Sequence, residues 1–134
     1  MNIDKVMTEV AHQLGTITGL RVYDFPQANP APPAAIVCYP NQIVYDETYQ
    51  RGYDMVSFNV GVLVGRVSDR AARRVVAGYA AGSGPSSIKA VLESGTYSEL
   101  DTIKVASAEF DVYTQTGQDY LAMIFEVEIT GRGE

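Results

Sequence analysis

Few side chains in this sequence are able to act as acids, bases or nucleophiles. The chain has one histidine, His12, and one cysteine, Cys38. A single histidine excludes a zinc site built from several histidines, and no Gly-x-Ser-x-Gly turn is present to accompany a serine triad. Cys38 lies in the apolar run 35–39, with no basic neighbour in sequence to lower its thiol pKa and no cysteine partner. We therefore expect His12 on a helix, at the surface or half-buried, and Cys38 as a small buried side chain.

Two further patterns are typical of ion or phosphate sites but incomplete. Glu126 and Glu128 point the same way from a predicted strand, yet no other oxygen ligands follow at the spacing of a metal-binding loop. The run 82–87, Gly-Ser-Gly-Pro-Ser-Ser, lacks the lysine of a P-loop and the glycine spacing of a dinucleotide site. We expect a solvated strand face and a capped helix start instead. The sequence thus predicts no catalytic residue, metal or cofactor, and a protein that is not an enzyme.

Arginine is concentrated in one short segment. Four of the ten basic residues fall within nine positions: Arg66, Arg70, Arg73 and Arg74. Arginine pairs with carboxylates and phosphates through two parallel hydrogen bonds, and it is favoured at interfaces over lysine. This segment predicts either a protein-contact surface that pairs with acidic groups of an adjacent subunit or an ordinary solvated helix face.

Tyrosines surround a polar loop near the middle of the chain. The loop 46–54 is charged, and Tyr45, Tyr49 and Tyr53 lie in it or at its start, together with Arg51. Tyrosines in a polar loop cannot all be part of the core, and each offers a large contact area at low entropy cost. We predict a protein interface here, formed with a neighbouring subunit or a second protein.

The acidic residues are unevenly distributed. Residues 1–92 contain eight basic and seven acidic side chains, whereas residues 93–134 contain two basic and nine acidic ones, which together give the net charge of −6. An acidic chain is unlike a dedicated nucleic-acid-binding protein, which usually has a basic surplus. Such polarity favours head-to-tail contact between identical subunits. An unremarkable solvated surface is the alternative.

The elements that position these residues follow from the periodicity of the apolar side chains. Helices are predicted at 3–14, at 70–81 after Ser68-Asp69, and at 88–94 after Ser86 or Ser87. Strands are predicted at 20–25, 34–39, 43–45, 55–64, 103–112 and 121–129. The apolar stripe of the second helix is expected to consist of Ala72, Val75, Val76, Tyr79 and Ala80.

Breaks in the pattern locate loops and irregularities. The segment 26–33 holds four of the six prolines and predicts an extended loop, and Pro40 predicts a turn or a strand end. A change of parity inside 103–112 predicts a β-bulge near Ala106-Ser107.

Together these elements predict one α+β domain over residues 1–134. The expected sheet is mixed or antiparallel, with about five to six strands and the helices packed on one face, and residues 131–134 are expected to form a frayed tail. No run of about 20 apolar residues is present, so no membrane span is expected. The N-terminus has no basic start and no apolar run of a secretory signal, so we expect assembly in a cytosol.

Several segments resemble tail terminator proteins of long-tailed, siphovirus-type bacteriophages of actinobacterial hosts. They are the run 19–26, Gly-Leu-Arg-Val-Tyr-Asp-Phe-Pro, the proline-rich step to 32–35, and the segments 45–52, 62–73 and 82–89. The likeness covers roughly residues 3–92, and the last two strands match by pattern only. Its motifs are not catalytic.

The resemblance implies a tail-terminator-like α+β fold and a structural role in the virion. Such a protein forms a homo-hexameric ring at the head-proximal end of the tail tube, ends tube polymerisation, and joins the head connector or stopper protein. DNA passes through its channel without sequence-specific binding, and no cofactor or membrane is involved. The ring assembles in the host cytoplasm. The alternatives are another neck component, such as a head–tail adaptor or stopper, and a non-viral small α/β binding module.

Overall fold

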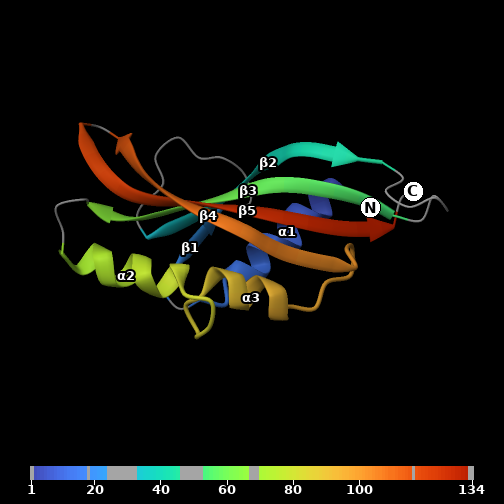
Figure 1. Cartoon of the computed structure of the whole chain (residues 1–134), viewed down its shortest axis with the longest axis horizontal. Helices are drawn as coiled ribbons and strands as arrows, with labels where there is room; N and C mark the ends of the chain where they lie inside the picture. The colour runs from blue at the N-terminus through green and yellow to red at the C-terminus, as the bar shows by residue number, and fades with distance from the viewer. Residues whose placement is uncertain are drawn as a thin grey trace.

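The computed structural model describes residues 2–17, 19–23, 33–45, 53–66, 70–115 and 117–132. Within them the chain forms three helices and five strands. Their bounds are α1 Ile3–Leu14, β1 Arg21–Tyr23, β2 Ala34–Val44, β3 Tyr53–Arg66, α2 Arg70–Ala80, α3 Ile88–Ser94, β4 Thr102–Gln115 and β5 Gln118–Arg132. The helices lie against one face of a sheet, so the predicted α+β class is confirmed (Figure 1). No helix in these residues is long and apolar enough to cross a membrane.

The described strands form one mixed sheet in the order β1-β2-β3-β5-β4. β1 runs parallel to β2, and each of the other neighbouring pairs is antiparallel. Along the central pair, β3 and β5, every second residue points toward the helices and is buried. These buried residues face one another as Val56 with Ile129, Phe58 with Val127, Val60 with Phe125, and Val62 with Met123. The predicted parity of both strands is therefore confirmed.

The first helix begins and ends where the sequence predicts. Asn2 caps α1, because its side-chain oxygen accepts the Lys5 N–H at 3.2 Å, and Gly15 follows its last turn. Its buried residues, which recur at the spacing of one helical face, are Val6, Met7, Val10 and Leu14. They pack against the sheet in the same apolar cluster as the residues of β3 and β5.

β2 continues through Pro40, where the sequence predicts a turn or a strand end. β1 pairs with β2 only at residues 34–36, so β2 beyond Val37 has a described strand on one side alone. A proline has no N–H to donate and is tolerated at such an edge. The register against β3 shifts on both sides of Pro40, which accommodates the proline as an irregularity within one strand. The prediction was wrong because it required knowing which strand lies beside Pro40.

The stripe that α2 buries is narrower than predicted. Ala72, Val76 and Tyr79 are buried, but Val75 is 40% exposed and Ala80 is also exposed. Both residues lie on the flanks of the helical face that Ala72, Val76 and Tyr79 define. Among the described elements, α2 packs against β3, β5 and α3, and these contacts cover only the centre of that face.

The short helix α3 is fixed at both ends by hydrogen bonds. Ser87 is fully buried, and its hydroxyl accepts the Ala90 N–H at 3.1 Å and donates to the Ala81 carbonyl. At the other end, Gln13 donates to the Val91 carbonyl at 2.9 Å, and the Tyr97 hydroxyl donates to the Leu92 carbonyl at 2.7 Å. These bonds satisfy carbonyl groups that a helix C-terminus leaves without partners. The predicted cap at Ser86 or Ser87 is Ser87.

β4 and β5 form a long hairpin, and the structure tests two predictions there. The register of β4 shifts between Val105 and Ser107, so the predicted bulge is confirmed. The predicted frayed tail is wrong for two residues: Gly131 and Arg132 belong to β5, where they pair with Asp54 and Tyr53 of β3. The early start of β3 provides the partner that keeps them in the sheet. Residues 133–134 lie outside the described residues.

Candidate functional site

The predicted arginine surface is present on α2. Arg70, Arg73 and Arg74 are exposed, and their spacing of three and four places them on one side of the helix. None of them forms an ion pair with a residue that the structure describes. Arg66 is the last residue of β3, and its side chain lies outside the described part of the chain.

This arginine face does not help α2 to fold on its own. Like charges at a spacing of three or four residues destabilise a helix by about 0.2–0.5 kcal/mol for each pair. The first turn of α2 also contains no acidic residue to offset them or to interact with the helix dipole. A cluster that is unfavourable in the isolated chain and lacks a described partner favours pairing with an acidic surface outside it.

The predicted tyrosine surface is described only in part. Tyr45 directly follows β2 and is 70% exposed, as an interface anchor would be. Tyr49 and Arg51 lie outside the described residues, and Tyr53 is the first residue of β3 with its side chain outside them. Sequence analysis missed one aromatic here: Tyr39, which is 66% exposed next to Pro40 on the bare part of the β2 edge. Its signal is its position beside a proline in an apolar run.

The structure does not bring the arginines and the tyrosines together. Tyr45 lies at the end of the molecule where β2 ends and β3 begins, and α2 begins beyond the opposite end of β3 (Figure 1). β3 has 14 residues and a strand rises about 3.3 Å per residue, so these ends are separated by roughly 40 Å. We call them the tyrosine end and the arginine end. They are two separate surfaces.

The acidic third of the chain forms the β4–β5 side of the sheet. Glu126 and Glu128 point to the face away from the helices, as their spacing predicts, and the Ser107 hydroxyl donates to Glu126 at 3.4 Å. Lys104 lies opposite Glu128 in the register of the two strands. No group of three or more His, Cys, Asp or Glu side chains in the described part of the chain is placed to hold a metal ion.

Cys38 is half-buried, not buried as predicted. It lies on the sheet face away from the helices, where β2 pairs with β3 near Gly61, and that face has no helix to cover it. Burial by its neighbours raises the pKa of the thiol, and a backbone hydrogen bond at Gly61 opposes this only in part. Its thiol therefore stays protonated at neutral pH, without the thiolate that nucleophilic chemistry needs.

A second titratable group, Glu9, ties α1 to the segment between α3 and β4. It accepts the backbone N–H groups of Ser98 at 3.1 Å and Glu99 at 3.3 Å, and the Ser98 hydroxyl. Burial alone would raise the pKa of Glu9, but these hydrogen bonds outweigh it and lower the pKa. Nearby Tyr97 has its pKa raised to about 12, first by burial and then by the charge of Glu9. The hydrogen bonds of Glu9 and Tyr97 therefore hold the segment between α3 and β4 against α1 and α3.

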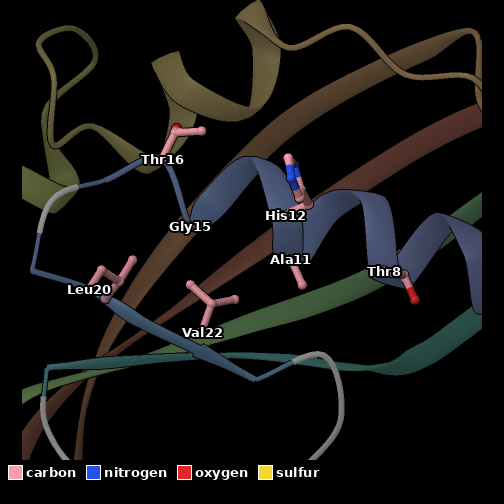
Figure 2. A pocket seen from close by; sticks show the side chains of 7 residues that line it. All are labelled: Thr8, Ala11, His12, Gly15, Thr16, Leu20 and Val22. Carbon is pink, nitrogen blue, oxygen red and sulfur yellow. The ribbon is translucent and has the colours of Figure 1, made fainter.

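A depression of the surface lies between α1 and β1, and His12 is among the residues that line it. Its volume is about 600 Å³, and it is lined by Thr8, Ala11, His12, Gly15, Thr16, Leu20 and Val22. Figure 2 shows the imidazole on the outer side of α1, pointing away from Leu20 and Val22. Apart from His12, the lining consists of a glycine and of aliphatic and hydroxyl side chains, so no acid–base pair lines this depression.

Two surfaces thus carry the interaction chemistry that the described residues offer: exposed tyrosines at one end and unpaired arginines at the other. Phe110 and Val112 of β4 are also exposed, and sequence analysis missed them. No known family model matches the chain, and a search of curated proteins found no match.

Proposed function

We propose that the protein is a structural subunit that caps the head-proximal end of a bacteriophage tail tube as a homo-hexameric ring. In this role it ends tube polymerisation and forms the joint to the head connector. The observation that carries the proposal is the separation of two unpartnered surfaces at opposite ends of β3. A subunit that must bind its own copies and a second protein needs two surfaces of this kind.

Three further features support the proposal. The segments within residues 3–92 resemble tail terminators, and the α+β class of the fold is the class that this resemblance implies. The interaction chemistry lies in aromatic and arginine side chains, which dominate protein interfaces. The net charge of −6 suits a channel that lets DNA pass, because like charge repels the phosphates. The protein then acts in the virion after assembly in the host cytoplasm, without a cofactor and without enzymatic activity.

The tyrosine end is the surface that we assign to the tube. The first experiment measures the solution mass of the purified protein by light scattering at two salt concentrations, followed by negative-stain imaging with and without the tail-tube protein of the same phage. We expect rings, either alone or on adding the tube protein, and tubes that stop growing at one end.

A triple variant tests the surface itself. Tyr45→Ala with Tyr49→Ala and Arg51→Ala is expected to weaken tube binding at least tenfold and to leave ring formation and the melting temperature unchanged. Tyr120→Ala, at the arginine end, is the matched control and should bind the tube normally. Unaltered tube binding by the triple variant would remove the assignment of this end.

The same experiment separates the alternatives. A ring that binds the head connector and not the tube is an adaptor or stopper. A protein that never forms rings and never binds a tube is a small α/β binding module, and the proposal then fails.

A further inference from the structure

The outer half of β4 exposes large apolar side chains on the face of the sheet that the helices cover elsewhere. After the bulge, Phe110 lies opposite Met123 and Val112 opposite Leu121, so both point to the side of the sheet that carries the helices. Met123 is fully buried, whereas Phe110 is 61% exposed and Val112 is 52% exposed. The end of the hairpin curves away from α2, and no helix lies against this part of β4 (Figure 1). We call residues 108–112 the β4 outer segment.

The same segment carries acidic side chains between the apolar ones. Glu109 and Asp111 alternate with Ala108, Phe110 and Val112, and both carboxylates are exposed. Glu109 has no hydrogen bond or ion pair with any residue that the structure describes. Successive side chains of a strand point to opposite faces, so Glu109 and Asp111 project from the face away from the helices, and Phe110 and Val112 from the face toward them. The β4 outer segment therefore presents negative charge on one side of the sheet edge and apolar contact area on the other.

The edge of β4 is poorly suited to pairing with another strand. Two of its backbone N–H groups are already used by carboxylates: that of Val112 by Asp111 at 2.8 Å, and that of Val105 by Glu93 at 3.0 Å. Addition of a strand requires such groups to be free. The side chains of the segment, and not its backbone, are what it offers to a partner.

The complement of this segment is found on the same chain. The outer side of α2 carries three exposed arginines that lack a described ion-pair partner, and Val75 is exposed on the flank of the helix next to Arg74. One surface is acidic and the other basic, and each includes exposed apolar side chains. Opposite potentials next to apolar contact area are an arrangement that protein interfaces use to select a partner and a register.

We propose that α2 of one copy docks along the edge of the β4 outer segment of a second copy, with Arg73 and Arg74 toward the face that carries Glu109 and Asp111, and Val75 toward the face that carries Phe110. The inference rests on the proposed function, since it assigns the contact by which the proposed ring closes. The contact is head-to-tail: each copy uses α2 toward one neighbour and β4 toward the other, so it repeats until a ring is complete. Both surfaces lie at the arginine end, and the tyrosine end stays free for the tube.

Charge reversal of each surface separately tests this contact. Arg73→Glu with Arg74→Glu reverses α2, and Glu109→Arg with Asp111→Arg reverses β4. Each variant alone is expected to self-associate at least tenfold more weakly than the natural chain, measured by sedimentation. Lys5→Glu with Arg21→Glu makes the same change of charge as the first variant at exposed positions on α1 and β1, and it should associate normally.

Mixing the two variants in equal amounts gives the decisive reading. The acidic α2 of the first variant then meets the basic β4 of the second, and every other contact is of the natural type. Association is therefore expected to return in alternating rings, which an even number of subunits allows. A misfolded variant cannot rescue its partner, and far-ultraviolet circular dichroism checks folding of each variant.

Three outcomes overturn the inference: an arginine variant that associates normally, a mixture that associates no better than its components, and a natural chain that stays monomeric at all concentrations. Rings that persist in the reversed variants and still stop tube growth would remove this contact and leave the proposed function standing. Rescued rings that fail to bind the tube would support this contact and contradict the proposed function.

Discussion

The two halves of β4 carry apolar residues on the same face of the sheet and meet different surroundings. In the first half, Val105 is buried and Ile103 half-buried beneath α3, and Glu93 of α3 holds the edge of the strand. In the second half, Phe110 and Val112 face the same side without a helix over them. An alternating pattern therefore predicts which residues share a face, but whether that face is buried depends on an element from elsewhere in the chain. The bare half is the surface that we assign to a second copy.

Weakening the packing of α3 over the first half of β4 should have the largest effect on stability. Leu92 is fully buried in α3, so Leu92→Ala is expected to lower the free energy of unfolding by about 2–5 kcal/mol through lost contacts and a cavity. Phe110→Ala removes a larger side chain from the bare half and should change it by less than about 0.5 kcal/mol. Urea unfolding of the isolated subunit at low concentration measures both, and equal losses would contradict the comparison.

Loosening the start of the covering helix should have an intermediate effect. Ser87→Ala removes the buried cap of α3 and leaves the Ala90 N–H and the Ala81 carbonyl without their partner, at a cost of about 1–3 kcal/mol. Ser94→Ala, at the exposed end of the same helix, is the matched control and should cost less than about 0.5 kcal/mol. If both variants melt alike, the cap does not hold α3 over β4.

The smallest expected effect is a pH dependence at the end of α3. The pKa of Tyr97 is raised from the ordinary value of 10 to about 12, so the fold favours the neutral hydroxyl that donates to Leu92. The stability that this shift contributes is fully present below pH 10, the ordinary pKa of tyrosine, and it is lost as the pH rises through about 12. Tyr97→Phe should lose about 1 kcal/mol at neutral pH and decline less steeply above pH 10. Urea unfolding between pH 8 and 12 compares the slopes, and parallel curves would show that Tyr97 does not cause the decline.

Local signals in the sequence predicted the local structure well. α1 spans the predicted residues 3–14, Ser87 caps α3, and the parity change near Ala106 marks the bulge, because helical periodicity, caps and alternation depend on a few neighbouring residues. Arg70, Arg73 and Arg74 are exposed on one side of α2 for the same reason.

Features that depend on distant neighbours were not predictable in this way. Pro40 lies inside β2 because β1 is too short to reach it, and Cys38 is half-exposed because no helix covers its face of the sheet. Phe110 has the parity of a core residue and is exposed because no described helix lies over it, and Val75 is exposed because it lies on the flank of the face that α2 buries. The sequence predicts an acidic partner for the arginines, but the proposal that it lies on the β4 outer segment required the register of β4.

Pro40 also affects how strongly the free chain tends to aggregate. Long, flat, unpaired strand edges on neighbouring molecules join into disordered aggregates at high protein concentration. The bare part of β2 interrupts such an edge with a residue that cannot donate, flanked by shifts in register that twist the strand out of plane. In the proposed assembly, a pool of free subunits would thereby be kept out of fibrous aggregates, and growth would be left to contacts that select their partner by charge and shape.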